Sequence, residues 1–498
     1  MGRVHYIALV DWQPAKKTNP HRSHIQVVFL VELGAVTPPP TNRKPSTASP
    51  PNAASSVNFK SPLARQFVVP PRLPGVPFPI QQSYAGRLNV SVNPRQVSQM
   101  FFWLVPADDA GGSKDLTIWV NGDACSGLVG AFQGNGPITM NPGRVPTKNP
   151  NSWTRSSNML YLDIPLNIGF TRGQATQRGS EDIGGLVFDF LTAFLKVFPE
   201  MNGLNLYMAG HAYSGTYISY AADKIYALQS KLALKLQGIL LINAFISTPD
   251  YQQHIPIASY VTKNNDAFKF TPAQLNHLQA TDNACGFSQY MTQHLTFPPR
   301  GVFPQVTKAV DPAHAPDFRE QCMIFMEMFQ GSSPDMNLGN IHDKPGMADP
   351  NFTKFVYPGR ADVQSAFNVD GARRWASCGD FNKVFPNGDA SPPPTLKVLP
   401  NVINHSKRTV IAHGLLDGTL PVDGMKLAIQ SMTWGGKQGF QQSVNSKFMV
   451  GGKYGGRYHT ERGLTFVEVA QSGSFMPHDQ GQAALSIFEY LLGKRPTP

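Results

Sequence analysis

The sequence predicts an α/β fold with a mostly parallel central sheet and helices on both of its faces. Residues 204–209 are a short apolar run that leads through a glycine into residues 215–226, whose apolar side chains recur at helical spacing. Residues 236–244 are almost continuously apolar, as is typical of a strand buried on both faces of a parallel sheet. Residues 183–198 carry apolar side chains at positions i, i+3 and i+4, which predicts an amphipathic helix covering the sheet.

Length and composition indicate a large globular protein. The chain has 498 residues, of which 41% are hydrophobic, enough for an extensive core. Its net charge is +11, but residues 1–65 hold eight Lys/Arg and two Asp/Glu, so six of these charges lie there. The rest are spread without a basic run, and we therefore expect no nucleic-acid binding. No window reaches the roughly 20 apolar residues that span a bilayer, so we expect no membrane span.

Further strands and a closing helix follow from the same kind of pattern. The expected strands are β-rich runs bounded by turn residues, and the closing helix is the last apolar segment of the chain. The strands are expected at residues 83–90, 101–104, 116–120, 409–413 and 464–472, and the helix at residues 485–492.

The turn after residues 204–209 is the candidate functional centre. An α/β-hydrolase presents its nucleophile on such a strand–turn–helix elbow, in the pattern Gly-x-Ser-x-Gly. The elbow position here holds Ala212, which has no hydroxyl to deprotonate. Ser214 follows two positions later in the first helical turn, so we expect its hydroxyl to point away from the direction of the Ala212 side chain.

Residues 210–215 read Gly-His-Ala-Tyr-Ser-Gly and resemble the Gly-Glu-Ser-Tyr-Ala-Gly motif of the serine carboxypeptidase family. Other landmarks of that family follow in the right order between Tyr84 and Leu492. They include Asn-Pro-Asn-Ser-Trp at residues 149–153 and Trp-Ala-Ser-Cys at residues 375–378. The resemblance implies an α/β-hydrolase fold with a cap insertion, of the type seen in secreted fungal enzymes.

The resemblance also divides the chain into four parts. Residues 1–77 are rich in Pro, Ser, Thr and Asn after residue 37 and lack an apolar period, so we expect a disordered leader, dispensable for folding up to about residue 75. Residues 78–248 and 361–498 are expected to form the hydrolase domain, and residues 249–360 the cap. The apolar run at residues 25–31 is too interrupted and too far from Met1 to be assigned as a secretory signal.

By the same resemblance, the catalytic serine, aspartate and histidine positions fall on Ala212, Asp417 and Ser474. Asp417 is the only one of the three that keeps the family's residue type. Without a histidine, its alternative role is a turn or N-cap aspartate of the following helix. His478 lies four residues beyond the histidine position, and we expect it to be an ordinary surface histidine.

The resemblance places an oxyanion hole and a substrate-binding turn at residues 121–128, together with the backbone N–H of Tyr213. Asn121 and Gly122 match the family, but Asp123 replaces the glycine that donates to the oxyanion. A negative charge at that point opposes oxyanion stabilisation. The alternative is a plain strand-to-helix turn that Asp123 caps.

Two further positions bear on substrate recognition. Gly134 and His211 stand where the family has two glutamates that recognise, as protonated carboxyl groups, the free carboxylate of a peptide. Neither residue can make that carboxyl-to-carboxylate hydrogen bond. His211 and His413 without a spaced third ligand do not make a metal site, so we expect no metal and no cofactor.

The sequence therefore predicts a serine carboxypeptidase-like protein that is catalytically inactive and keeps a pocket for a peptide or small-molecule ligand. The alternative is an active serine-type carboxypeptidase, hydrolase or acyltransferase with relocated catalytic residues. Nothing in the sequence indicates an oligomeric state.

The family resemblance also pairs the four cysteines, as Cys125–Cys378 and Cys285–Cys322; the cysteines alone allow three pairings. Two disulfides imply an oxidising compartment, and hence a secreted or vacuolar protein of the secretory pathway. The glycosylation acceptors expected in that case are the Asn-x-Ser/Thr sites at Asn89, Asn351 and Asn404.

Overall fold

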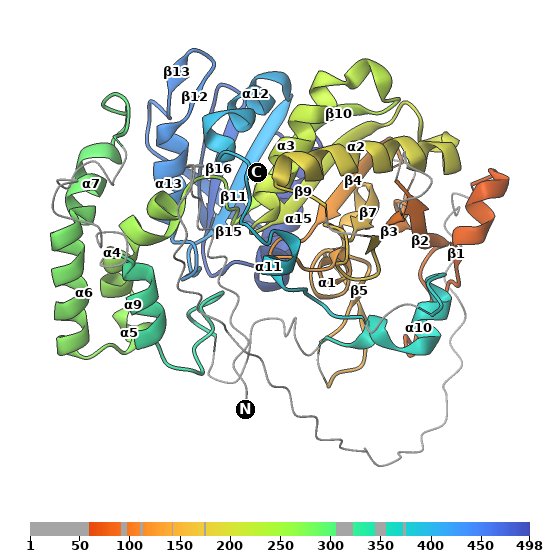
Figure 1. Cartoon of the computed structure of the whole chain (residues 1–498), viewed down its shortest axis with the longest axis horizontal. Coiled ribbons are helices and arrows are strands. Elements are labelled where there is room, and N and C mark those ends of the chain that lie inside the picture. Colours follow the sequence, from red (N-terminus) through yellow and green to blue (C-terminus); the bar gives the residue numbers. More distant parts are fainter. Residues whose placement is uncertain are drawn as a thin grey trace, which may run out of the picture.

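One large sheet organises the part of the chain that the structure describes (Figure 1). This computed structural model describes residues 59–90, 97–109, 113–141, 143–173, 176–304, 322–343, 355–371 and 375–498. Among these residues, twelve strands form a single mixed sheet, and helices cover both of its faces. The predicted α/β fold class is confirmed.

The centre of the sheet is parallel and both of its ends are antiparallel. The described strands follow the order β1-β2-β3-β7-β4-β9-β10-β11-β16-β15-β14, with β8 paired to β3. Neighbours from β7 to β16 are parallel, and the remaining pairs are antiparallel. The bounds are β1 Val68–Val69, β2 Ser83–Asn89, β3 Ser98–Val105, β4 Asp115–Val120, β7 Asn158–Leu162, β8 Arg172–Gly173, β9 Asn205–His211, β10 Lys235–Ile242, β11 Arg408–Gly414, β14 Ser446–Val450, β15 Lys453–Glu461 and β16 Leu464–Val469.

Each face of the sheet has its own hydrophobic core, because successive side chains of a strand point to opposite faces. In β9, Leu206 and Met208 lie in one core, whereas Tyr207 and Ala209 lie in the other. Helices α2 (Ser180–Val197), α3 (Ser214–Ala227), α12 (Val398–His405) and α13 (Val422–Ser431) pack on the first face. Helices α1 (Gly127–Gln133) and α15 (Gly481–Leu491) pack on the second. None of the described helices combines the length and apolar character that crossing a membrane requires.

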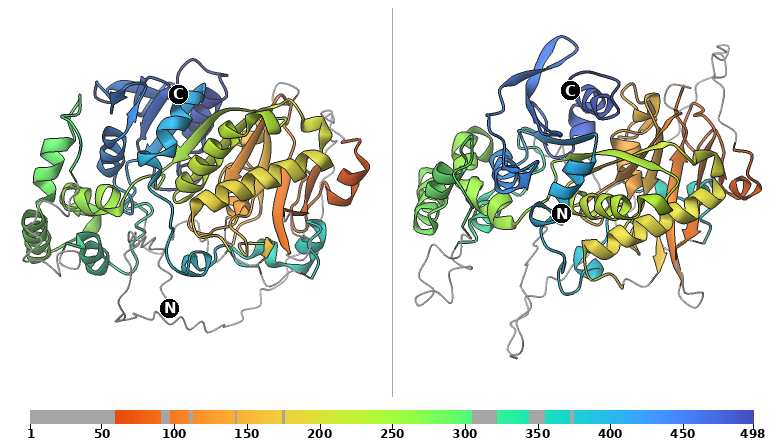
Figure 2. Two further views of the ribbon diagram at one scale, coloured as in Figure 1. Left: turned by 45° about the horizontal axis from the view of Figure 1, so that its top comes forward. Right: turned by 90° about the horizontal axis from the view of Figure 1, so that it is seen from above.

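A group of helices inserted after β10 lies to one side of the sheet, as Figure 2 shows. These helices share a third hydrophobic core, to which both Cys285 and Cys322 belong. The described members are α4 Ile255–Lys263, α5 Asn265–Phe268, α6 Pro272–Cys285, α7 Phe287–His294 and α9 Ile324–Gly331, preceded by a π-helical turn at Asp250–His254. The division of the chain at residues 248 and 360 stays a prediction.

The remaining described elements are short. Two two-stranded ribbons pair β5 (Ile138–Thr139) with β6 (Thr147–Lys148) and β12 (Thr433–Trp434) with β13 (Lys437–Gln438). The short helices are α10 Ala361–Ala366, α11 Phe381–Val384 and α14 Met476–Asp479. The 3-10 turns are Pro62–Phe67, Trp153–Arg155, Pro199–Met201, Gln229–Lys231, Tyr357–Gly359 and Pro394–Leu396.

The predicted leader boundary at residue 77 is wrong, because residues 59–77 are folded. Strand β1 pairs with β2 at the edge of the sheet, and Phe59 is 7% exposed. The Phe59 ring packs edge-on against Tyr84 at 5.0 Å and Phe198 at 5.2 Å. Six buried apolar side chains of this Pro-rich stretch thus pack into the two cores without a regular helical or strand period: Phe59, Ala64, Phe67, Val69, Leu73 and Val76.

Both predicted disulfides are present. Cys125 is bonded to Cys378, and Cys285 to Cys322. Glycosylation of Asn89 and Asn404 stays a prediction, and Asn351 lies outside the described residues.

Candidate active site

A strained backbone elbow joins β9 to α3. Ala212 lies at its apex with φ +57°, a left-handed conformation that a residue with a Cβ rarely adopts. Its N–H donates to the carbonyl of Ile242 at 3.1 Å, and its own carbonyl accepts from Phe245 N at 3.0 Å. A Cβ on Gly122 would lie 2.4 Å from the carbonyl oxygen of His211, so a glycine is required where that loop touches the elbow. The elbow thus has the geometry that presents a nucleophile, with a methyl group at its tip.

Ser214 does not take the place of a nucleophile at this elbow. Its hydroxyl donates to the carbonyl oxygen of His211 at 2.8 Å, and the residue is fully buried. The expectation that this hydroxyl points away from the Ala212 direction agrees with this geometry.

Asp417 follows β11 and is fully buried, with both carboxylate oxygens already engaged. Oδ1 accepts from the hydroxyl and N–H of Thr419 and from Leu420 N, and Oδ2 accepts from the Asn243 amide at 2.9 Å. Burial raises the pKa of this carboxyl to about 6, and these hydrogen bonds limit the rise. The alternative role as a helix N-cap is wrong, because Pro421 precedes α13; Asp417 closes a turn instead.

Ser474 lies in the loop between β16 and α14 and is partly exposed. Its N–H donates to the carbonyl of Gly339 at 2.6 Å. His478 is on α14, exposed, with its Nδ1 3.1 Å from the carbonyl oxygen of Gln133. His478 therefore faces the end of α1, as expected of a surface histidine.

The oxyanion hole that the sequence places at Tyr213 is already occupied. The Tyr213 N–H donates to the carboxyl of Asp123, whose backbone is left-handed with φ +55°. The pKa of Asp123 is raised to about 7, chiefly by burial. The hydrogen bond from Tyr213 N lowers this pKa, and the nearby charge of Asp417 raises it. The protein's own carboxyl thus sits on the donor that a reaction intermediate would need.

The alternative in which Asp123 caps the following helix is wrong. The N-cap of α1 is Ser126, whose hydroxyl oxygen accepts from Leu128 N at 3.2 Å. The loop that carries Asp123 is held by the Cys125–Cys378 disulfide and by a 2.8 Å hydrogen bond from Ser126 N to the carbonyl of Ser377.

An aromatic ring fills the space beside Gly134. A Cβ on Gly134 would lie 2.9 Å from Cζ of Phe475, so the ring leaves no room for a longer side chain there. The same ring packs at 5.2 Å against His211. His211 is buried, and its Nε2 has no hydrogen-bond partner among the described residues. Burial lowers its pKa to about 4, so it is neutral at physiological pH. Asn121 is buried too, and its Oδ1 accepts from the indole N–H of Trp119 at 2.6 Å.

The second histidine considered as a ligand is equally enclosed. His413 is fully buried with Nε2 2.7 Å from the carbonyl oxygen of Leu420, and burial lowers its pKa to about 4. Across the described parts of the chain, no three His, Cys, Asp or Glu side chains come together as a metal site would require.

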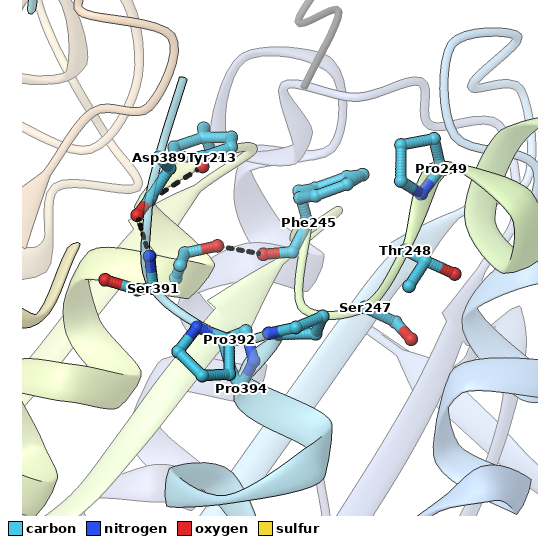
Figure 3. Close-up of a pocket in the computed structure, with 11 residues that line it drawn as sticks. Tyr213, Phe245, Ser247, Thr248, Pro249, Asp389, Ser391, Pro392 and Pro394 are labelled. Atoms are coloured by element: carbon cyan, nitrogen blue, oxygen red, sulfur yellow. Dashed lines mark hydrogen bonds between the residues drawn. The ribbon is translucent and has the colours of Figure 1, made fainter. Parts of the chain in front are cut away.

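A narrow pocket opens next to the elbow, on the side of the Tyr213 ring (Figure 3). The ring stacks on Phe245 at 5.7 Å, and Tyr213 Oη donates to Asp389 at 2.9 Å. The pocket has room for little more than a water molecule. Sequence reasoning missed Asp389 and Phe475, because neither stands in a pattern that indicates a partner so far away in the chain.

Comparison with known proteins relates this chain to serine carboxypeptidases. A family model described as serine carboxypeptidase matches residues 74–494. The chain is 31% identical over 464 residues to a carboxypeptidase Y homolog of Arthroderma benhamiae, covering 90% of each chain. It is 30% identical over 462 residues to a probable serine carboxypeptidase of the same organism, covering 85% of each.

A solved structure shows the same fold. The crystal structure of a prohormone-processing carboxypeptidase from Saccharomyces cerevisiae superposes with a TM-score of 0.69 at 20% identity, covering 86% of this chain and 96% of that chain. At this identity the likeness supports the α/β-hydrolase fold alone.

Proposed function

This chain belongs to the serine carboxypeptidase family, and we propose that it is a catalytically inactive member that keeps the fold and the pocket. The observation that carries the proposal is the elbow itself. A strained left-handed backbone is retained at Ala212, where it presents a methyl group in place of a nucleophile.

The residues at the aspartate and histidine positions support the same proposal. A serine or any other hydroxyl needs a neighbouring base to become a nucleophile at neutral pH. Asp417 has four donors on its carboxylate, and Ser474 is the residue at the histidine position. In hydrolases with this triad, loss of the nucleophile or the base leaves only about 10³–10⁴-fold catalysis over water, which comes from binding and the oxyanion hole.

Even that residual contribution is weakened here. The Asp123 carboxyl accepts the Tyr213 N–H, so an oxyanion would have to displace it. Phe475 fills the space beside Gly134, and His211 is a neutral imidazole. Peptides with a free C-terminal carboxylate are therefore expected neither to bind tightly nor to be cleaved. A peptide or small-molecule ligand would have to be recognised in another way, and outside the narrow space beside Tyr213.

The alternative with relocated catalytic residues requires a hydroxyl beside a free base. Ser214 lies two positions after the elbow apex, but it is buried and its hydroxyl is bonded to the His211 carbonyl. This contact gives the alternative no support at Ser214. Two disulfides and the carboxypeptidase relatives are consistent with a protein of the secretory pathway.

Labelling by a fluorophosphonate probe tests the proposal. The unmodified chain is expected to show no covalent label, because such probes react with an activated hydroxyl. The Ala212→Ser, Ser474→His double variant is the positive control, and Ser214→Ala is the matched negative control. Labelling of the unmodified chain would contradict the proposal, and its loss in Ser214→Ala would identify a relocated nucleophile.

A further inference from the structure

A short segment of the inserted region lies directly on the two loops that carry Asp417 and Ser474. We call residues 337–343 the bridging segment. Gly418 N donates to the carbonyl of Leu338 at 2.8 Å, and Ser474 N donates to the carbonyl of Gly339 at 2.6 Å. Ile341 N donates to the carbonyl of Leu416 at 3.0 Å. Backbone bonds from one segment thus reach both loops.

The contact is tight as well as hydrogen-bonded. A Cβ on Gly473 would lie 2.1 Å from the carbonyl oxygen of Gly339, and a Cβ on Gly418 would lie 2.9 Å from Cγ2 of Ile341. The bridging segment therefore approaches the two loops at glycines, where a residue with a Cβ would clash with it. Ile341 is 5% exposed and belongs to the hydrophobic core of the inserted helices.

Two asparagines give the bridging segment its shape. Asn337 Oδ1 accepts from Gly339 N at 2.9 Å, and its amide donates to Asp343 at 2.8 Å. Asn340 donates from its amide to Asp479 at 3.1 Å, which adds a side-chain tie to α14. The turn is thus pinned internally by Asn337 and externally by Asn340.

The two loops also contact each other directly, since a Cβ on Gly414 would lie 2.1 Å from the carbonyl oxygen of Gly473. Leu415 N donates to the carbonyl of Val469 and Leu416 N to that of Ser472, whereas the amides of Gly418 and Ser474 donate to the bridging segment. In hydrolases with a complete triad, a histidine–aspartate hydrogen bond links the two corresponding loops.

We propose that the bridging segment serves as a strap that ties the Asp417 loop to the Ser474 loop, so that movement of the inserted helices is transmitted to both of these loops. Leu338 and Ile341 of the strap pack against Gly418, the residue that follows the buried Asp417. Opening of the strap releases the Gly418 and Ser474 amides together and leaves the underlying sheet intact.

Amide hydrogen exchange of the full chain tests this strap. In Asn337→Ala, exchange at Gly418 and Ser474 is expected to rise roughly tenfold, because each lost hydrogen bond weakens the turn. The Leu416 amide, bonded to Ser472, is expected to keep its protection. The matched control is Asn265→Ala, which removes a similar asparagine that pins a turn elsewhere among the inserted helices through Phe270.

The outcomes separate cleanly. Unchanged exchange at Gly418 and Ser474 in Asn337→Ala, or an equal rise in Asn265→Ala, overturns the proposal. If Asn337→Ala destabilises the whole fold, the exchange rates of β10 amides such as that of Leu241 rise together with those of Gly418 and Ser474. Asn340→Ala then decides, because it removes the tie to Asp479 together with the acceptor of the His342 N–H and leaves the Asn337 hydrogen bonds in place. A rise confined to Ser474 and Gly418 supports the strap, and no rise contradicts it.

Discussion

A chain that begins at Gly75 is expected to melt about 10 °C or more below a chain that begins at Phe59. The deletion removes four larger apolar side chains that are at most 7% exposed, namely Phe59, Phe67, Val69 and Leu73, together with the buried Ala64. Burial of such side chains contributes about 1.5–3 kcal/mol each, so the sum is comparable with the ~5–15 kcal/mol by which a domain is stable.

Local contacts explain why the loss cannot be repaired by neighbours. Gly86 has φ +155° and a Cβ there would lie 2.5 Å from the Phe67 ring, so the ring fills a space that no other residue of β2 can fill. The Lys60 N–H also donates to Glu200 at 2.7 Å. Thermal unfolding followed by circular dichroism measures the difference, and equal melting temperatures would restore the expectation that residues up to about 75 are dispensable.

Restoring the triad is expected to produce activity only in combination. Ala212→Ser alone should give no measurable ester hydrolysis, because no base lies beside the new hydroxyl. Ala212→Ser with Ser474→His should give weak activity, because among the described residues Oδ2 of Asp417 accepts one hydrogen bond, from the Asn243 amide, and has a lone pair left for an imidazole N–H.

Freeing the oxyanion hole should then add the larger gain. Asp123→Gly in the double variant removes the carboxyl from the Tyr213 N–H, and glycine suits the left-handed backbone at this position. One oxyanion donor contributes about 10²–10³-fold in rate, so a gain of that order over the double variant is expected for an activated ester.

Asp123→Asn is the matched control, because it removes the charge and keeps an acceptor on the Tyr213 N–H. It should give much less gain than Asp123→Gly if occupation of the donor is what blocks the hole. Equal gains would show that charge alone is responsible, and full activity in Ala212→Ser would show that a base exists elsewhere.

The elbow and the central strands could be predicted from the sequence because their signals are local. The apolar run before Gly210 and the helical period after it give β9 and α3 nearly to the residue. The triad positions could be assigned because the family motifs keep their order along the chain. The disulfide pairing followed from the same resemblance and is confirmed.

The contacts that could not be predicted join distant parts of the chain without a periodic pattern. Phe59 packs on Phe198, and neither the Pro-rich stretch around it nor the family match, which begins at residue 74, indicates that contact. Asp389 receives the Tyr213 hydroxyl from a segment with no strand or helix period. The hydrogen bond from Tyr213 N to the Asp123 carboxyl depends on a left-handed backbone that the sequence does not specify.

Release of C-terminal residues from N-blocked dipeptides at acid pH tests the absence of peptidase activity most directly. The unmodified chain is expected to release them no faster than buffer alone, with an active serine carboxypeptidase assayed in parallel to show that the assay detects such cleavage. Release by the unmodified chain that persists through purification and disappears in Ser214→Ala would contradict the account.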